Sequence, residues 1–219
     1  MPFAQLIGIN GYGKSIVFSC ALLENDKEET LCWLFRTFLD VMDGKKPSTI
    51  ITHQDSAIHK SIAEVFHTVF HRFNLWHVMR EAAVEFGGFT ANRPGMEAEL
   101  THLIMNSLTT EEFEDGWIAV LEKYGSASNA HLKLMYQTRL MWVPVYFKHV
   151  FCPFIRSPGH SQSTYSIFKD YVLREDTIEI FISQYNIFQM EAVSIEHGDR
   201  CESTLKKPML QKYTRWGCS

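Results

Sequence analysis

Residues 48–73 read STIITHQDSAIHKSIAEVFHTVFHRF and contain the pattern that decides the fold class. The short apolar run at 48–52 predicts a buried strand, which ends abruptly in the polar group His53-Gln54-Asp55. Apolar residues at helical spacing then predict an amphipathic helix over 55–66, and a second strand is expected over 68–73. This strand–helix–strand order is typical of α/β proteins.

The rest of the first 86 residues continues the alternation of strands and helices. Two β-rich runs joined by a short glycine-containing loop predict a hairpin, and helical patterns flank the strand–helix–strand unit. The whole stretch therefore predicts an α/β sheet with one antiparallel edge. The flanking elements are expected as strands at 2–10 and 14–23, a helix from Glu28 closed by Gly44 and Pro47, and a helix over 75–86 stopped by Gly87-Gly88.

Residues beyond 90 have a different, mainly helical character. Helices are expected at 96–107, 111–124 and 130–136, and Thr109 precedes acidic residues that suit the first turn of a helix. Further helices are expected at 161–173 and 176–188, after which the helical periodicity fades. The predicted division is an N-terminal part of the core at 1–89, a helical insertion at 90–150, C-terminal helices of the core at 151–190 and a loose tail at 191–219.

Composition excludes several classes of protein. Hydrophobic residues make up 46% of the 219 residues and aromatic residues 13%, so the chain can bury a sizeable core. The formal net charge of −4 argues against tight DNA binding by this segment alone. Its five cysteines form no Cys-x-x-Cys pair, which favours a reducing compartment over a zinc ribbon or a disulfide framework. The sequence shows neither a signal pattern nor an apolar stretch long enough to cross a membrane.

The polar residues expected near element ends are His53, Asp55, His77 and Gln162. Two-metal nucleotidyl transfer requires several carboxylates around a pair of cations, and only Asp55 among these four is an acid. Asp55 is a weak metal candidate because its position also suits capping of the helix that follows it, and we favour that role. His77 is a second weak metal candidate.

Three other patterns in the sequence suggest functional sites, but each also fits a simpler structural role. His67, His71 and His77 suggest zinc, but the segment around the first two is expected to be extended rather than helical, and no cysteine lies nearby. Packing and surface roles are therefore favoured. Residues 8–15, GINGYGKS, fit the letters of a phosphate-binding loop, but β-branched and aromatic residues follow where that motif needs a helix. A Gly-rich hairpin turn is therefore favoured there. The serines lack a convincing base and acid for a hydrolase triad: Ser157, Ser161 and Ser163.

Several segments together carry a resemblance to a known family. The chain resembles the transposase domain of Mutator-like elements, in the plant form found in the far-red-impaired-response family of transposase-derived transcription factors. This resemblance implies a ribonuclease H-like mixed sheet with an all-helical insertion, in a protein of the nucleus. It covers about residues 1–190 in the family's order and spacing, in the segments MPFAQLIGINGYGKSIVFSCALL, EETLCWLFRTFLDVMDGKKPSTIITHQDSAI, VFHRFNLWHV, QTRLMWVPVY, SQSTYSIFKDYV and IEIFISQYN.

Departures from the family pattern carry the functional expectation. The family's first aspartate lies on a strand just upstream of the segment that aligns with Met1, its second falls on His53, and its glutamate falls on Gln162. The cysteine of the family's Cys-x-x-His falls on Asn74. The resemblance therefore implies a degenerate site at His53 and Gln162, no catalytic residues, no cofactor and no enzyme activity. Intact relatives use Mg²⁺ or Mn²⁺, and zinc belongs to their flanking modules.

The leading hypothesis is a truncated, catalytically inactive, transposase-derived nuclear protein related to far-red light-signalling regulators. It would act through protein partners or related family members, without a membrane. The aspartate-bearing strand is central in a ribonuclease H-like sheet, so its absence is expected to require a partner strand, a rearranged sheet or poor folding. Two alternatives remain: a fragment of an active Mutator-type transposase that needs an upstream segment, and a non-functional gene relic.

Overall fold

A computed structural model describes residues 2–9, 15–90, 92–150 and 177–205. Within these residues the chain has a mixed α/β architecture with seven α-helices and two separate two-stranded sheets. The expected single sheet with one antiparallel edge is wrong for this part of the chain, because the hairpin and the parallel pair do not hydrogen bond to each other. The chain divides into two compact units, Met1–Gln5 with Ser19–His160, and Leu6–Phe18 with Ser161–Ser219, and each is described by itself.

The predicted N-terminal hairpin is confirmed. Strand β1 (Phe3–Ile9) and strand β2 (Ser15–Leu22) form a two-stranded sheet, and β2 leads into a backbone hydrogen bond from Leu23 N–H to the carbonyl of Pro2 at 2.8 Å. A strand, not a helix, therefore follows residues 8–15, so the context that a phosphate-binding loop requires is lacking.

The first helix also begins and ends where the sequence predicts. Helix α1 (Glu28–Val41) buries Leu31 and Phe35 on one face, and its C-terminus closes through the N–H of Gly44, which donates to the carbonyl of Leu39 at 2.8 Å. Gly44 has a φ of 72°, a left-handed conformation in which glycine avoids the steric cost of a Cβ. The predicted closure at Gly44 is confirmed.

The strand–helix–strand unit forms with small changes in its bounds. Strands β3 (Thr49–Thr52) and β4 (Phe70–Phe73) pair in parallel, with Thr49 opposite Phe70 and Thr52 opposite Phe73. Helix α2 (Ser56–Val65) connects them and packs against α1, where the rings of Phe35 and Phe66 meet edge to face at 5.5 Å. The strand–helix–strand unit that the spacing of apolar residues predicts is therefore confirmed, as a parallel pair of strands connected by a helix.

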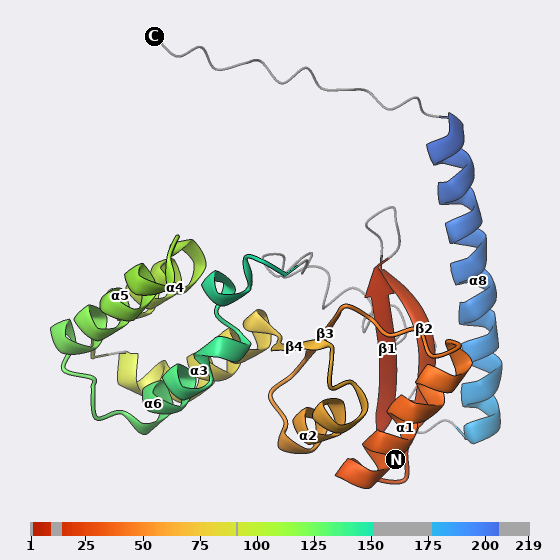
Figure 1. Cartoon of the computed structure of the whole chain (residues 1–219), viewed down its shortest axis with the longest axis horizontal. Coiled ribbons are helices and arrows are strands. Elements are labelled where there is room, and N and C mark those ends of the chain that lie inside the picture. The colour runs from red at the N-terminus through yellow and green to blue at the C-terminus, as the bar shows by residue number, and fades with distance from the viewer. Residues whose placement is uncertain (1, 10–14, 91, 151–176, 206–219) are drawn as a thin grey trace. The chain divides into compact units, whose positions relative to one another are not determined.

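Four helices and two short 3₁₀ turns of the first unit enclose a hydrophobic core, and Figure 1 shows the helices α3 to α6. Trp117, Trp142 and Phe113 are at most 2% exposed at its centre. The Trp142 indole N–H lies 3.2 Å from the hydroxyl of Thr138, so this buried donor has an acceptor. The elements are α3 (Leu75–Thr90), α4 (Met96–Asn106), α5 (Thr110–Lys123), α6 (Ala130–Gln137), η1 (Arg139–Met141) and η2 (Pro144–Phe147).

The expected stop of the third helix at Gly87-Gly88 is wrong, because α3 continues to Thr90. Phe89, beyond the glycines, is partly buried against the helical core, and the guanidinium of Arg93 lies 3.8 Å from its ring centre. Glycine costs about 1 kcal/mol per residue in a helix interior. Packing of Phe89 and Arg93 offsets that cost and carries the helix past both glycines.

Helix α8 (Ile178–Leu205) belongs to the second unit and is longer than predicted. The helix expected to end at 188 continues through Gly198 and so includes the first part of the stretch expected to be a loose tail. A single glycine weakens a helix without stopping it, and the first proline after it is Pro208. The helix expected at 161–173 lies outside the described residues.

None of the helices in the described part of the chain combines the length and the apolar character that crossing a bilayer requires.

Candidate functional site

The carboxyl ends of β3 and β4 lie at the same edge because the two strands are parallel and in register. Each strand leads at once into a helix: His53 to Asp55 connect β3 to α2, and Asn74 connects β4 to α3. This arrangement brings together two of the predicted site residues. The imidazole rings of His53 and His77 meet edge to face, with centres 5.7 Å apart.

Asp55 acts as the N-cap of α2, as the sequence predicts. Its backbone is extended, and its carboxylate oxygen Oδ1 accepts a hydrogen bond from the N–H of Ile58 at 2.8 Å. Asn74 has an equivalent role at α3, where its side-chain oxygen accepts from the N–H of His77 at 3.2 Å. Both short connections therefore satisfy helix-start donors with their own polar side chains.

His77 has both ring nitrogens engaged. Arg80 has only donors, so its Nη2, 2.9 Å from His77 Nδ1, donates to an unprotonated nitrogen. The other nitrogen, Nε2, then carries the proton and lies 3.2 Å from the carboxylate of Glu81. Burial lowers the pKa of His77, Glu81 opposes that shift, and Arg80 and His53 add to it.

The three histidines of the zinc hypothesis are not brought together. His67 is exposed, and its Nδ1 lies 3.0 Å from the backbone carbonyl of Glu64. His71 points instead toward Thr52 and His59, and His77 toward Arg80 and Glu81. Among the described residues, no group of three or more His, Cys, Asp or Glu side chains could hold a metal ion.

A histidine pair that the sequence does not predict joins α2 to β4. The Nδ1 atoms of His59 and His71 are 3.2 Å apart, and the two rings are stacked with centres 5.3 Å apart. His71 Nε2 lies 2.9 Å from the hydroxyl of Thr52, which is hydrogen bonded to the carbonyl of His53 at 2.8 Å. The two histidines are on α2 and β4, so no local spacing pattern could have indicated their contact.

The helical core carries a polar network that the sequence analysis also missed. The carboxylate of Glu114 on α5 accepts hydrogen bonds from the hydroxyls of Tyr136 and Tyr146 and from Arg139 Nε, the last at 2.7 Å. Burial opposes ionisation of Glu114, but these three donors outweigh it and lower its pKa. Burial, followed by the bond to Glu114, raises the pKa of Tyr146 to about 12. The network ties α5 to α6 and to both 3₁₀ turns.

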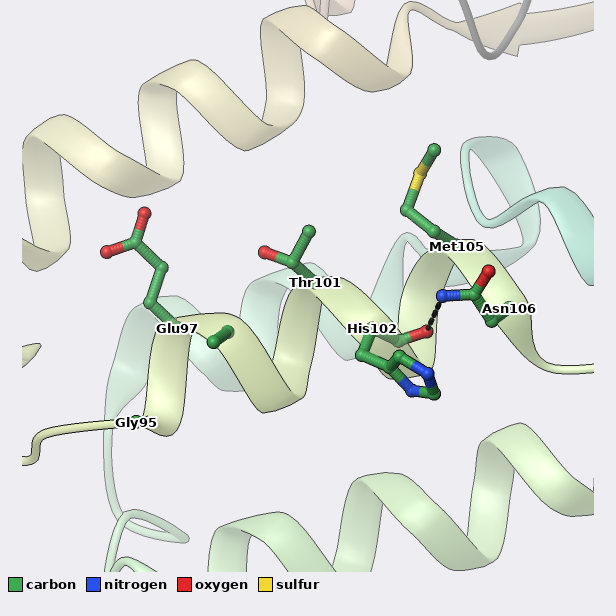
Figure 2. A pocket seen from close by; sticks show the side chains of 7 residues that line it. Gly95, Glu97, Thr101, His102, Met105 and Asn106 are labelled. Atoms are coloured by element: carbon green, nitrogen blue, oxygen red, sulfur yellow. Dashed lines mark hydrogen bonds between the residues drawn. The ribbon is translucent and has the colours of Figure 1, made fainter.

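A surface hollow of about 690 Å³ runs along one face of α4. Figure 2 shows Glu97, Thr101, His102 and Met105 along this face, and Asn106 Nδ2 donates to the carbonyl of His102 at 3.1 Å. Because a single helix and the preceding Gly95 line it, the hollow does not gather convergent groups from several elements. It is separate from the edge formed by β3 and β4.

Four predicted site residues lie outside the described residues. They are Gln162 and the three serines of the hydrolase hypothesis, Ser157, Ser161 and Ser163.

Comparisons with known proteins confirm the resemblance drawn from the sequence. Residues 1–81 match the family model described as the MULE transposase domain. The chain is 31% identical to Protein FAR1-RELATED SEQUENCE 2 of Arabidopsis thaliana over 96% of its length, and 27% identical to Protein FAR-RED IMPAIRED RESPONSE 1 of the same plant over 99%. Protein FAR1-RELATED SEQUENCE 7 is 31% identical over 96%. The chain spans about a quarter of these curated relatives, 26%, 26% and 27% of their lengths.

Proposed function

Since the chain is a homologue, over nearly its whole length, of the transposase-derived FAR1-related proteins of plants, we propose that it is a catalytically inactive regulatory protein of the nucleus. In this proposal the transposase domain has lost its chemistry and keeps its fold as a scaffold for contacts with other proteins. The fold and the function of the chain are supported by separate observations.

The observation that carries the proposal is His53 at the end of β3. The resemblance places the family's second catalytic acid at this position, where a rigid strand holds a carboxylate for a metal ion. His53 is exposed and its ring lies against that of His77, 5.7 Å between centres. A neutral imidazole brings no negative charge, so it cannot replace a carboxylate that binds Mg²⁺ and spreads transition-state charge.

Neighbouring groups do not compensate for the missing acid. The carboxylate of Asp55 is committed to the N–H of Ile58, where it stabilises the start of α2. The Arg80 guanidinium is hydrogen bonded to His77 and adds a positive charge beside the same edge. A fixed positive charge raises the free energy of a divalent cation placed nearby, which works against two-metal catalysis.

The fold part of the proposal is a ribonuclease H-like sheet with a helical insertion. It is supported by the order of elements, in which a hairpin precedes a parallel pair of strands connected by a helix. It is also supported by the block of helices that follows, which has its own core around Trp117 and Trp142. The hairpin and the parallel pair form separate two-stranded sheets in the described residues, so the test adds a peptide with the sequence of the family's upstream strand. In a crystal structure this peptide should join the two sheets into one, and sheets that stay separate would contradict the proposal.

A DNA cleavage assay tests the loss of activity. Purified full chain is incubated with labelled duplex DNA and Mg²⁺ or Mn²⁺, beside the Asp55→Asn variant and an active transposase of the same family. Asparagine caps a helix as well as aspartate does, so Asp55→Asn removes the charge while it keeps the fold. We expect no cleavage above background from either chain. Metal-dependent cleavage that disappears in Asp55→Asn while this variant still unfolds cooperatively would overturn the proposal.

Nuclear residence and protein contacts need a separate experiment. A fluorescent fusion of the full chain in plant cells should accumulate in the nucleus, and FAR1-related proteins should co-purify with it. The net charge of −4 supports protein contacts over direct DNA binding by this segment. Exclusion from the nucleus, or tight binding of duplex DNA at physiological salt without any protein partner, would contradict this part.

A further inference from the structure

The pair of histidines between α2 and the β3–β4 sheet is separate from the degenerate catalytic position. His71 on β4 is only 9% exposed, and His59 on the overlying α2 stacks on it. The ring of Phe73 closes the group, edge-on to His71 at 5.6 Å and to His59 at 6.1 Å. One buried imidazole thus contacts the helix and the strand pair at once.

The hydroxyl of Thr52 fixes which nitrogen of His71 carries the proton. A carbonyl oxygen can only accept, so the 2.8 Å contact between Thr52 Oγ1 and the carbonyl of His53 uses the single hydroxyl hydrogen. Thr52 Oγ1 must then accept from His71, whose Nε2 lies 2.9 Å away and carries a hydrogen. In neutral His71 the other nitrogen, Nδ1, is therefore bare and can only accept.

The direction of the remaining contact follows from that assignment. Because His71 Nδ1 accepts, His59 must supply the hydrogen across the 3.2 Å between the two Nδ1 atoms. The result is a directed series of hydrogen bonds, from His59 to His71, from His71 to Thr52, and from Thr52 to the carbonyl of His53. It crosses from α2 through β4 to the end of β3.

We propose that this series is an acid-sensitive latch that holds α2 on the β3–β4 sheet and opens when both histidines carry two protons. Neither ring then has a bare nitrogen, so two N–H groups face each other across the contact between His59 and His71. Two donors at that distance repel, and the rings must separate. This inference is independent of the proposed function, because it uses only the backbone carbonyl of His53 and no side chain assigned to the degenerate site.

The two histidines are not equivalent in this latch. A second proton on exposed His59 leaves its Nδ1–H in place, so the bond to His71 persists and becomes charge-assisted. A further proton on His71 then removes the last acceptor. The latch therefore opens at the second of the two protonations, that of the buried imidazole.

The surroundings of His71 offer its cation little stabilisation. From α2 it faces His59, and from its own strand it lies beside Arg72, whose Nη1 donates to the carbonyl of His71 at 3.1 Å. From β3 it faces the neutral hydroxyl of Thr52. Burial, followed by His59 and Arg72, lowers the pKa of His71 from 6.5 to about 4.

The sign of the pH dependence follows from that lowered pKa. The unfolded chain binds this proton with the ordinary pKa of 6.5, and the folded chain binds it only near 4. Between these values the unfolded state holds more protons, so acid favours unfolding. The stabilising effect of neutral His71 is complete above pH 6.5 and is lost as the pH falls toward 4.

Nuclear magnetic resonance of the full chain with ¹⁵N-labelled histidine tests the latch directly. At pH 7.5 we expect His71 protonated at Nε2 and bare at Nδ1, and His59 protonated at Nδ1. The midpoint of the His71 titration should lie well below 6.5, toward 4. The Nδ1–H tautomer of His71, or a midpoint at or above 6.5, would overturn the proposal. Signals are assigned by their loss in His71→Gln and His59→Gln.

Variant unfolding provides the second readout. His71→Gln can still donate to Thr52 and accept from His59, but it cannot take up a proton. Relative to it, the unfolding equilibrium constant of the parent chain should rise by up to about tenfold per pH unit between pH 6.5 and 4. His102→Gln, on exposed α4 surface, is the matched control and should follow the parent. Equal pH dependence of parent and His71→Gln contradicts the latch.

A metal ion between the two Nδ1 atoms is the competing explanation of their closeness, so unfolding is measured in EDTA and again with added Zn²⁺. The latch predicts the same melting temperature in both. A rise with Zn²⁺ that His71→Gln abolishes would show a metal site and would overturn the proposal.

Discussion

Replacement of Asp55 by alanine tests whether the acid at the end of β3 has a structural role. The substitution removes the carboxylate oxygen that accepts from the N–H of Ile58 at 2.8 Å in a part-buried position. Loss of an N-cap side chain costs about 0.5–2 kcal/mol. Helix α2 has ten residues and buries Ile62 and Val65, so a weakened start also loosens apolar packing. We expect Asp55→Ala to lower the free energy of unfolding by about 1–2 kcal/mol.

Asparagine at the same position separates the cap from the charge. Asp55→Asn keeps an oxygen that can accept from Ile58 and loses only the attraction between a negative charge and the helix N-terminus, about 0.3–1 kcal/mol. If Asp55 acts as an N-cap, Asp55→Ala should lower the free energy of unfolding clearly more than Asp55→Asn does. Exposed Asp115 in the middle of α5 is the matched control, and its change to alanine should alter stability by less than about 0.5 kcal/mol.

Urea unfolding of the four chains at pH 7.5, followed by tryptophan fluorescence and circular dichroism, measures these differences. The slope against urea should stay constant, so that the shift in midpoint reports stability alone. Two results would contradict the role of Asp55 as an N-cap. One is that Asp55→Ala is as stable as the parent, and the other is that Asp55→Asn lowers the free energy of unfolding as much as Asp55→Ala does. The second would mean that the charge of Asp55, and not its role as a cap, is what the fold uses.

Two further predictions concern the helical core. Glu114→Gln should destabilise the chain by about 1–3 kcal/mol, because it weakens three charge-assisted hydrogen bonds, and it should move the pKa of Tyr146 from about 12 toward 10. Urea unfolding measures the first change and ultraviolet titration the second, with exposed Glu97→Gln as the control. An unchanged titration of Tyr146 would contradict the network. Gly116→Ala would place a Cβ 2.4 Å from Leu103 Cδ1, where α5 packs on α4. It should lower the free energy of unfolding by about 1–3 kcal/mol, although alanine has the better helix propensity. If the clash is the cause, Gly116→Ala will be nearly neutral in a chain that already carries Leu103→Ala, which a double-mutant cycle measures.

Local patterns predicted the strand–helix–strand unit and the role of Asp55 because both are set by near neighbours. Apolar spacing over 55–66 determines one face of α2, and an acid directly before that face satisfies a donor three residues later. The hairpin and the closure at Gly44 follow in the same way from glycine and β-branched residues close in sequence.

Tertiary packing decided what the sequence could not show. Gly87-Gly88 carry a strong local stop signal, but the burial of Phe89 against the helical core outweighs it. The contact between His59 and His71 joins residues twelve positions apart on different elements. Glu114 likewise meets Arg139, 25 residues away, through the packing of α5 on the helices that follow. Contacts of this kind leave no periodic trace.

Binding of Mn²⁺ at the end of β3 tests the central claim, a transposase-derived domain without a catalytic metal site, most directly. Increasing Mn²⁺ is added to the full chain while the imidazole resonances of His53 and His77 are recorded, with exposed His102 as the reference for non-specific broadening. We expect all three resonances to broaden alike, because His53, the capping Asp55 and Arg80 form no site for hard cations. Selective, saturable broadening of His53 and His77 that Asp55→Asn abolishes would contradict it.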